Sequence, residues 1–528
     1  HELCRALLTG GVDFDYIAES LVDDINISAL PYDTIIAAEC VTLRPSTIKF
    51  LHRFAQNGGR LIIMGTPPSM SLGEFSHDAA SLCTDAECIP FDMTELFALV
   101  RPDVLIQNSD GTRTNDLLFT RRHCDGCDWI FVAQAKQPIL PHITDRRSIT
   151  VTVDGMYVPK LFDTLSGDVC EVSCTANGGK TKMYFDICNS DSLLIQLTPT
   201  DEGYEHFCEK REPFGEEIIL PSKVDIILAE PNVLLLDRAD FYLDGKLVCK
   251  NEEMLRADNA IREILGFDKR ETKVVQPWAV AGEPEDHTVT MRFSVLSDIC
   301  CNDVHIALEN GAKAEISLNG IAADKTICGY YVDKNIVTRP LPPIKSGQNT
   351  LEISVPFGVR TDLENSFILG DFGCECVGDH IRITEKPAEH YYGSVVHGGY
   401  PFYGGNLEYR TEFELDTASD IRLAVSLYGG TFVKVLIDGE EVGNIAFAPY
   451  ELTVSGVGAG VHSLSFVLFG NRYNTFSSLH NLSADKPRVY IGPAYWRSKG
   501  DNWSYEYHQR EFGILKKPIL CVKRQIGI

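Results

Sequence analysis

The amino-acid sequence lacks the features of a membrane protein and of a nucleic-acid-binding protein. No apolar run approaches the roughly 20 residues that a transmembrane helix needs, and no secretory signal peptide is visible. Lysine and arginine number 48 against 74 aspartates and glutamates, which gives a formal net charge of −26. Because phosphate binding needs a basic surface, this charge argues against a nucleic-acid partner. Neutral or cationic ligands suit the chain better, and carbohydrate is the commonest neutral class.

Nucleotide-binding and nucleophile motifs are missing from the one segment that has the pattern of a βαβ unit. Two short apolar runs, Thr34–Ala38 and Leu61–Met64, flank a helical pattern that starts at Pro45. Short connections of this kind predict a buried parallel pair of strands. The turn Glu39–Thr42 has neither a Gly-rich phosphate cradle nor a Gly-x-Ser-x-Gly elbow, so we expect no cofactor. Cys40 is the one nucleophile candidate, and we favour a small buried thiol over a catalytic residue that would need a histidine base.

The cysteines form no dense disulfide framework. There are 17 of them, an odd count, and we find one pair with metal spacing, Cys124 and Cys127 after His123. A structural zinc ion needs four ligands, and no second pair stands nearby. The Asp125-Gly126 between the two cysteines is a hairpin-turn signal, so we predict a hairpin without metal. Reduced thiols favour a cytoplasmic or anaerobic setting.

The sequence does not start like a complete domain. His1 is not an initiator methionine, and Glu2–Leu8 already has the pattern of a helix body. We therefore expect this chain to be the C-terminal part of a longer protein, which leaves export open. A processed or tagged N-terminus on a small complete domain is the alternative.

Beyond the βαβ unit, short alternating strands and Gly-containing turns predominate. The predicted fold class is a mostly β multidomain protein with a partial N-terminal α/β flavodoxin-like module, an antiparallel β domain and tandem jelly-roll, galactose-binding-like β-sandwiches. We place the four domains at residues 1–85, 90–200, 222–385 and 386–528.

The tandem sandwiches are predicted from a repeated pattern. In each copy a strand runs into a turn that favours a type I′ hairpin, Asn319-Gly320 in the first and Asp438-Gly439 in the second. Some 20 to 30 residues later, a Gly-containing turn leads into a final alternating strand. This order is that of jelly-roll sandwiches of the galactose-binding type.

Aromatic residues supply the candidate carbohydrate contacts, because sugar rings stack on aromatic faces. Tyr400, Phe402 and Tyr403 lie among glycines in an irregular loop, and Trp496 borders a polar stretch. The alternative for each of them is packing between domains. We favour packing for Trp278 and Trp496, and we leave both interpretations open for the Tyr400–Tyr403 loop.

Several phrases resemble a family. Residues 32–68 resemble the glutamine-amidotransferase-like module that follows the catalytic barrel in several glycoside hydrolases. Further phrases resemble the C-terminal half of large bacterial glycosidases similar to α-L-rhamnosidases, namely EPNVLLLDRADFYLDGK, LENSFILGDFG, GGYPFYGGNLEYRTEFEL and GNRYNTFSSLHN. The last phrase has Ser477-Ser478-Leu479-His480 where the family usually has Gly-Pro-His, so the resemblance assigns no role to this segment.

The resemblance implies that the catalytic carboxylates lie on a (β/α)8 barrel upstream of His1. In the resembling enzymes the Tyr400–Tyr403 loop opens the last sandwich, near that barrel. The sequence pattern agrees with a barrel outside this chain, since no βα pattern recurs here over the ~250 residues that a barrel occupies. Glu230, Asp237, Asp240, Glu364 and Asp371 flank strands and turns, and we favour structural roles for them.

Three functional hypotheses follow. We favour a non-catalytic portion of a glycoside hydrolase that supports an upstream catalytic domain and contributes to glycan binding. The alternatives are a stand-alone carbohydrate-binding protein and a self-sufficient enzyme that uses Cys40.

Overall fold

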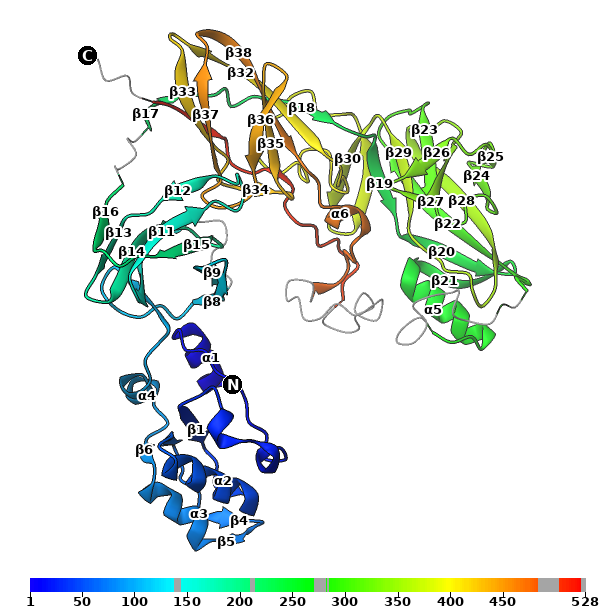
Figure 1. The fold of residues 1–528 in the computed structure, drawn as a ribbon. Coiled ribbons are helices and arrows are strands. Elements are labelled where there is room, and N and C mark those ends of the chain that lie inside the picture. Colours follow the sequence, from blue (N-terminus) through cyan, green and yellow to red (C-terminus); the bar gives the residue numbers. More distant parts are fainter. Residues whose placement is uncertain (137–143, 209–213, 270–281, 283, 483–502, 524–528) are drawn as a thin grey trace. The chain divides into compact units, whose positions relative to one another are not determined.

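The structure is a computed structural model that describes residues 1–136, 144–208, 214–269, 282, 284–482 and 503–523 (Figure 1). The chain forms two compact units, residues 1–212 with 447–449, and residues 213–446 with 450–528. Of the described residues, 46% are in strands and 12% in helices, which confirms the prediction of a mostly β multidomain protein. None of the described helices has the length and apolar character needed to cross a bilayer.

The first unit begins with an α/β module built on the parallel sheet β1-β3-β6. The predicted strands and helix are confirmed, because β1 and β3 pair in parallel and the helix between them starts at Pro45. The elements of the module are α1 (Glu2–Thr9), β1 (Thr34–Ala38), β2 (Thr42–Leu43), α2 (Pro45–Gln56), β3 (Arg60–Met64), β4 (Met70–Ser71), β5 (Glu74–Phe75), α3 (His77–Ser81), β6 (Glu87–Ile89) and α4 (Met93–Leu99).

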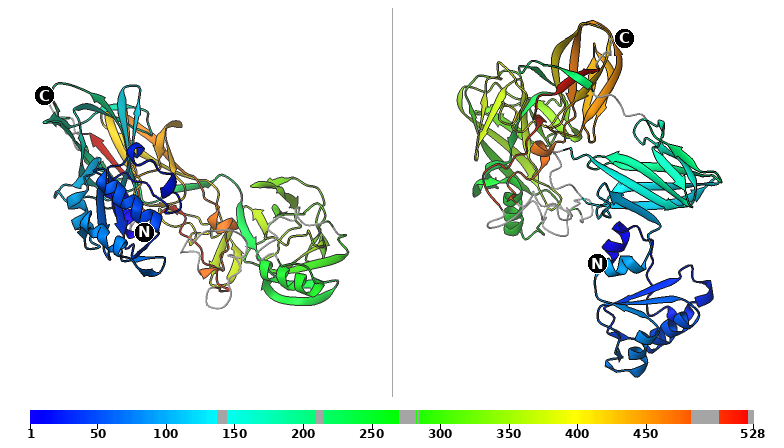
Figure 2. Two further views of the ribbon diagram at one scale, coloured as in Figure 1. Left: turned by 60° about the horizontal axis from the view of Figure 1, so that its bottom comes forward. Right: turned by 90° about the vertical axis from the view of Figure 1, so that its left-hand side faces the viewer.

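Helices cover both faces of this sheet because the side chains of β3 alternate between them. Leu61 and Ile63 pack with α2, whereas Ile62 and Met64 pack with α1 and α4. The helices (blue) lie against the strands in Figures 1 and 2.

Two five-stranded antiparallel sheets follow in the first unit and enclose one apolar core. The sheet orders are β16-β13-β14-β10-β7 and β12-β11-β15-β9-β8. The strands are β7 (Val104–Asn108), β8 (Leu117–Cys124), β9 (Cys127–Gln134), β10 (Arg147–Asp154), β11 (Tyr157–Phe162), β12 (Val169–Glu171), β13 (Cys174–Asn177), β14 (Lys180–Ile187), β15 (Ser192–Pro199) and β16 (Tyr204–His206).

The second unit contains a sandwich that we call the inserted sandwich, residues 232–269 and 284–384. Its sheets have the orders β19-β29-β23-β27-β26 and β21-β20-β22-β28-β24-β25, and the hairpin β30–β31 joins the second sheet through one residue pair, Ile383 of β31 with Ser297 at the end of β22. The elements are β19 (Asn232–Leu236), β20 (Arg238–Leu243), β21 (Lys246–Glu253), α5 (Met254–Leu265), β22 (His287–Ser297), β23 (Val304–Leu308), β24 (Glu315–Leu318), β25 (Ile321–Ala322), β26 (Gly329–Tyr331), β27 (Asp333–Pro340), β28 (Gly347–Phe357), β29 (Ser366–Gly370), β30 (Gly373–Val377) and β31 (His380–Thr384).

The other sandwich of this unit, the host sandwich, is made of residues 214–228, 407–482 and 503–523. Its sheets have the orders β17-β40-β33-β37 and β18-β32-β38-β35-β36. The elements are β17 (Phe214–Ile218), β18 (Asp225–Leu228), β32 (Leu407–Leu415), β33 (Ser419–Ala424), β34 (Tyr428–Gly429), β35 (Val433–Ile437), β36 (Glu440–Ile445), β37 (Glu451–Val457), β38 (Gly460–Leu468), α6 (Tyr473–Phe476), β39 (Gly513–Ile514) and β40 (Ile519–Lys523).

The pairing of β18 corrects the predicted start of the first sandwich at residue 222. Asp225–Leu228 pairs with Leu407–Arg410 of β32, so this segment belongs to the host sandwich. The inserted sandwich therefore interrupts the host sandwich after its second strand.

The two sandwiches repeat one strand order. The order β20-β22-β28-β24-β25 in the inserted sandwich corresponds to β18-β32-β38-β35-β36 in the host sandwich. On the facing sheets, β19-β29-β23-β27 of the inserted sandwich corresponds to β17-β40-β33-β37 of the host sandwich. Both predicted hairpins are present, with φ of +53° and +77° at Asn319 and Gly320 and of +52° and +84° at Asp438 and Gly439. The internal repeat that the turn pattern predicted is a repeat of topology.

The repeat extends to the register of the strands. Arg292 of β22 lies opposite Asp240, and Arg410 of β32 lies opposite Asp225. The same arginines lie opposite Glu352 and Ser465 on the next strand. An Asp–Arg cross-strand pair therefore occupies equivalent positions in both sandwiches.

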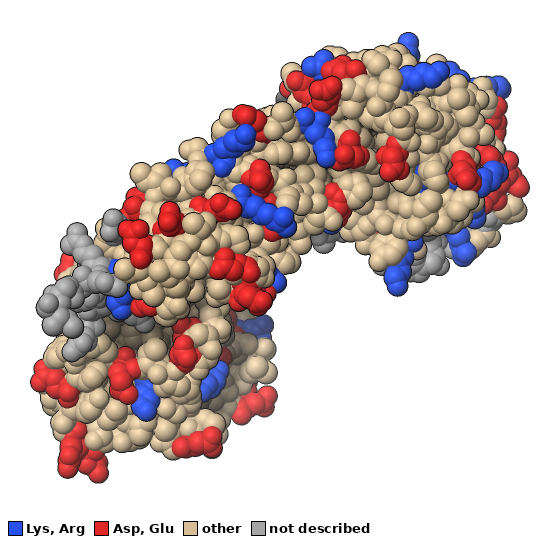
Figure 3. All heavy atoms as spheres, turned by 90° about the horizontal axis from the view of Figure 1, so that it is seen from above, with Lys and Arg blue, Asp and Glu red and all other residues tan. Residues whose placement is uncertain are grey.

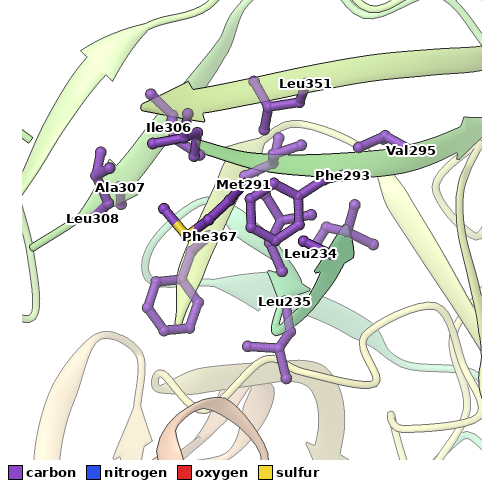
Figure 4. Packing of buried hydrophobic residues seen from close by; sticks show 14 of the residues in the cluster. Leu234, Leu235, Met291, Phe293, Val295, Ile306, Ala307, Leu308, Leu351 and Phe367 are labelled. Atoms are coloured by element: carbon purple, nitrogen blue, oxygen red, sulfur yellow. The ribbon is translucent and has the colours of Figure 1, made fainter. Parts of the chain in front are cut away.

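The core of the inserted sandwich lies between its two sheets (Figure 4). Phe293 and Met291 of β22 point towards Leu234 and Phe367 of the facing sheet. Parallel pairing in the described residues is confined to β1-β3-β6, β2–β4 and a single residue pair between β22 and β31, so these residues form no (β/α)8 barrel.

Candidate functional site

The structure corrects the expectation of an aromatic binding loop. Tyr400, Phe402 and Tyr403 are 2%, 0% and 0% exposed. Phe402 packs into the core of the inserted sandwich, and the two tyrosines pack into the core of the host sandwich. The Tyr403 hydroxyl donates to Asn406 O at 2.9 Å. These rings have no exposed face for a sugar, so the structure assigns them to packing. Trp496 and Trp278 lie outside the described residues.

The cysteine candidates have local structural explanations. Cys124 and Cys127 lie opposite each other across a two-residue turn, with φ of +54° at Asp125 and +76° at Gly126. The described residues contain no group of three or more metal-ligating side chains. Burial raises the pKa of the Cys40 thiol, which donates to Ala38 O, and a raised pKa disfavours the nucleophilic thiolate.

Two of the five carboxylates considered above, Glu230 and Asp371, are held in ion pairs with basic side chains. Glu230 binds Arg472 through both of its oxygens, with one pair of atoms 2.7 Å apart. Asp371 pairs with Lys386. Asp237 differs from these two, because it lies buried at the junction of β19 and β20.

Asp237 joins two side chains from the end of the chain. Its Oδ1 accepts a hydrogen bond from the Tyr507 hydroxyl at 2.7 Å, and its Oδ2 lies 3.2 Å from His480 Nε2. The His480 ring is 4% exposed and lies 4.7 Å from the Tyr507 ring, centroid to centroid. Both contacts join segments more than 240 residues apart, so Asp237 fastens the C-terminal segment to the inserted sandwich.

Glu253 is a second buried carboxyl group beside this cluster. It is 7% exposed and caps α5, accepting from Arg256 N at 3.0 Å. Burial raises the pKa of Glu253 to about 7, with the charge of Asp237 acting in the same direction.

The pKa of His480, the basic member of the cluster, is set by two opposing effects. Burial lowers the pKa of His480, but the hydrogen bond and charge of Asp237 outweigh burial, and the net pKa is raised. Burial also holds the pKa of Tyr507 far above its ordinary value, so the phenol stays protonated and donates. Glu253 therefore changes charge near neutral pH, and the raised pKa of His480 favours the charged form of its ring.

A groove of about 820 Å³ opens beside this cluster on the outward face of the inserted sandwich. Alternation along the strands creates this face: Phe241 and Phe293 point into the core, whereas Asp240 and Arg292 point outward. The hairpin β30–β31 forms a wall of the groove. Polar side chains from these elements and from the C-terminal segment line it, namely Asp237, Arg238, Asp240, Asn251, Arg292, Ser294, Gln348, Thr350, Glu375, Asp379, His380, Arg382 and Tyr507.

Ion pairs orient the three guanidinium groups of the groove. Arg238 binds Asp379 at 3.0 Å, and this hydrogen bond lowers the pKa of Asp379. Arg382 binds Glu375 at 2.5 Å. Arg292 binds Glu352 at 2.7 Å and donates to the Tyr242 hydroxyl at 2.8 Å. The groove thus offers fixed donors and acceptors side by side, an arrangement suited to hydroxyl groups.

Two aromatic rings in this region, those of Tyr242 and Tyr505, lie against arginines, and Tyr507 lines the groove. The Arg292 guanidinium lies 4.8 Å from the Tyr242 ring centroid, and the Arg238 guanidinium lies 4.7 Å from that of Tyr505. Such contacts restrict the arginine side chains. Hydrogen-bonding side chains outnumber aromatic rings along the lining of the groove.

Sequence reasoning named Asp237 and Asp240 but placed no binding groove at them. Arg238, Arg292 and Arg382 were not singled out, because each is an ordinary strand residue in the sequence. The alternation of strand β20, in which polar Asp240 lies between apolar neighbours, was the available signal for an outward polar face.

Comparisons with known proteins give the following results. No protein-family model matches the chain, and no curated protein matches it. Among solved structures, the chain is similar to a rhamnosidase from Novosphingobium sp. PP1Y, with a TM-score of 0.41 and 12% identity over 93% of this chain and 34% of that chain. It is similar to an exo-carrageenase from Bacteroides ovatus, with a TM-score of 0.27 and 11% identity over 38% of this chain and 26% of that one.

A third similar structure is α-L-fucosidase isoenzyme 2 from Paenibacillus thiaminolyticus, with a TM-score of 0.26 and 8% identity over 38% of this chain and 44% of that one. The chain thus spans about a third of the length of the rhamnosidase. At these TM-scores the likeness assigns no activity, and the candidate site rests on the residues of the groove.

Proposed function

We propose that this chain is a non-catalytic, carbohydrate-binding portion of a glycoside hydrolase of the α-L-rhamnosidase-like kind, joined to an upstream catalytic domain. The observation that carries the carbohydrate part of the proposal is the groove on the inserted sandwich. Its carboxylates, guanidinium groups and amides are the groups that bind sugar hydroxyls. The sequence phrases quoted above carry the link to glycoside hydrolases.

The non-catalytic part of the proposal rests on the roles of the carboxylates. Glycoside hydrolysis uses two carboxyl groups about 5–10 Å apart across the scissile bond. In this chain Asp379 and Glu375 are bound to arginines, and Asp237 is bound to Tyr507 and His480. Each is engaged in holding the groove together, which leaves hydrolysis to another domain.

The test is a glycan array probed with the full chain, followed by calorimetric titration of the hits and an assay of nitrophenyl glycosides. We expect binding without turnover, and we expect Arg292→Ala to weaken binding about ten-fold or more, the effect of losing one charge-assisted contact of about 1.5–3 kcal/mol. Arg410→Ala is the matched control, because Arg410 occupies the equivalent position of the host sandwich and pairs with Glu408.

The control variant should bind as the unmodified chain does. Equal loss of binding in both variants, or an array without hits, would contradict a binding role for the groove. Turnover that disappears on changing a single Asp or Glu would contradict the non-catalytic assignment.

A stand-alone carbohydrate-binding protein remains the second candidate, since the groove supports it equally. The genomic sequence upstream of His1 separates the two.

A further inference from the structure

The charges that line the groove limit the kind of sugar that fits it. Four carboxylates, those of Asp237, Asp240, Glu375 and Asp379, face three guanidinium groups, and His380 lies among them. The lining is therefore mixed, with a small excess of negative charge when the histidine is neutral.

The guanidinium groups are already matched to carboxylates of the protein. Arg238, which is 9% exposed, is held by Asp379, Arg382 by Glu375, and Arg292 by Glu352. A ligand carboxylate or sulfate that approached one of these arginines would lie beside the carboxylate that already binds it. Like charges in such proximity oppose binding, by up to several kcal/mol where they are desolvated.

Hydroxyl groups meet no such penalty. A sugar hydroxyl donates to a carboxylate oxygen and accepts from an N–H group, so it can use both members of an ion pair without breaking it. The side chains of Glu375 and Arg382 are 47% and 43% exposed, which leaves both heads accessible to a ligand. The amides of Gln348 and Asn251 add neutral donors and acceptors to the lining.

The surface charges and the net charge give no reason to expect a polyanion. Acidic and basic side chains are interspersed on the face drawn in Figure 3, which shows no continuous basic area. The formal net charge of −26 also repels a polyanionic chain at a distance.

From this charge arrangement we infer that the groove selects neutral, hydroxyl-rich oligosaccharides and discriminates against uronic-acid and sulfated ones. This inference rests on the proposed carbohydrate-binding function and names its ligand class.

The experiment compares the binding of acidic oligosaccharides with that of their carboxyl-reduced derivatives, which we call the neutral twins. Oligogalacturonides and other uronic oligosaccharides are printed on the glycan array beside the same compounds after reduction of each carboxyl group to a hydroxymethyl group. We expect the full chain to bind the neutral twin about ten-fold or more tightly than the acid wherever either binds, with a ratio that shrinks as salt screens the repulsion.

A charge variant provides the second measurement. The double substitution Asp240→Asn/Glu375→Gln removes two negative charges from the groove and should move the neutral-to-acid ratio at least about five-fold towards the acid, about 1 kcal/mol at 1.4 kcal/mol per ten-fold. Glu440→Gln, at an exposed hairpin of the host sandwich, is the control and should leave the ratio unchanged.

The outcomes separate this inference from the proposed function. Acids that bind as tightly as their neutral twins, or a ratio that the double variant does not move, would overturn the charge-based selection and leave carbohydrate binding intact. An array on which neither form of any glycan binds would overturn both.

Discussion

The inserted and host sandwiches have the same framework and differ in what is added to it. Nine strands follow one another in the same order, and an Asp–Arg pair lies at equivalent positions, Asp240–Arg292 in one and Asp225–Arg410 in the other. After β29, however, the inserted sandwich adds the hairpin β30–β31, whereas the equivalent strand of the host, β40, is the last described strand. The groove thus depends on an addition to the framework, which agrees with the general finding that sites are grafted onto folds.

The outward faces also differ at equivalent positions. Gln348 and Thr350 of β28 correspond to Val461 and Ser463 of β38, as the pairing with the preceding strand shows. Val461 is 64% exposed, so the host sandwich presents an apolar side chain where the inserted one presents an amide. We expect the host face to lack hydrogen-bonding recognition of sugars for this reason.

The largest predicted effect concerns the aromatic core of the host sandwich. Tyr403→Ala should destabilise the second unit by about 3–5 kcal/mol, as for other buried aromatics, because the ring is 0% exposed. Chemical denaturation of the full chain, followed at the transition of this unit, measures the change. Tyr330→Ala, at a 57% exposed position of the inserted sandwich, is the control and should have little effect. A Tyr403→Ala shift no larger than that of the control would return this residue to the candidates for binding.

The next effect concerns the buried charges of the inserted sandwich. Glu253 has an ordinary pKa of 4.5 and a pKa of about 7 in the folded protein. Between these pH values the folded state therefore keeps a proton on Glu253 that the unfolded state has released. Stability of this unit therefore falls as the pH rises from 4.5 to 7, by up to about 3 kcal/mol at 1.36 kcal/mol per unit.

Glu253→Gln should remove most of this dependence and raise the melting temperature at pH 8, because a neutral amide retains an acceptor for Arg256 N. His480, whose pKa is raised, acts in the same direction, since its contribution is present below pH 6.5 and is lost above its folded pKa. Melting curves recorded from pH 4 to pH 8 give the result. Parallel profiles for the variant and the unmodified chain would show that Glu253 does not ionise in this range.

The smallest effect tests whether the repeat is energetic as well as topological. Gly320→Ala and Gly439→Ala place a Cβ atom in open space but force a left-handed backbone, with φ of +77° and +84°. Each substitution should lower the free energy of unfolding by about 1–2 kcal/mol. The two losses should be similar if the hairpins are equivalent. Differential scanning calorimetry of the two variants makes the comparison. A cost at one hairpin alone would break the equivalence.

Local sequence patterns predicted local structure, but they could not predict the contacts between segments that are far apart in the sequence. Pro45 with its flanking apolar runs predicted the βαβ unit, and the Asn-Gly and Asp-Gly pairs predicted both hairpins, since these signals act within a few residues. The partner of Asp225–Leu228 is a strand some 180 residues later, so no local pattern could assign it to the host sandwich.

The candidate site was harder to predict than the fold for the same reason. Asp237 becomes part of a site only when His480 and Tyr507 return to it from the end of the chain. The glycine and aromatic composition around Tyr403 was compatible with both exposure and burial, and the packing of the host core decided between them.

Hydrogen–deuterium exchange of the full chain, with and without a glycan found on the array, tests the central claim most directly. The account predicts that the glycan slows exchange in β20 and in the hairpin β30–β31 and leaves β18 and β32 of the host sandwich unchanged. Protection in the host strands, or none in the hairpin at a saturating glycan concentration, would contradict a binding groove on the inserted sandwich.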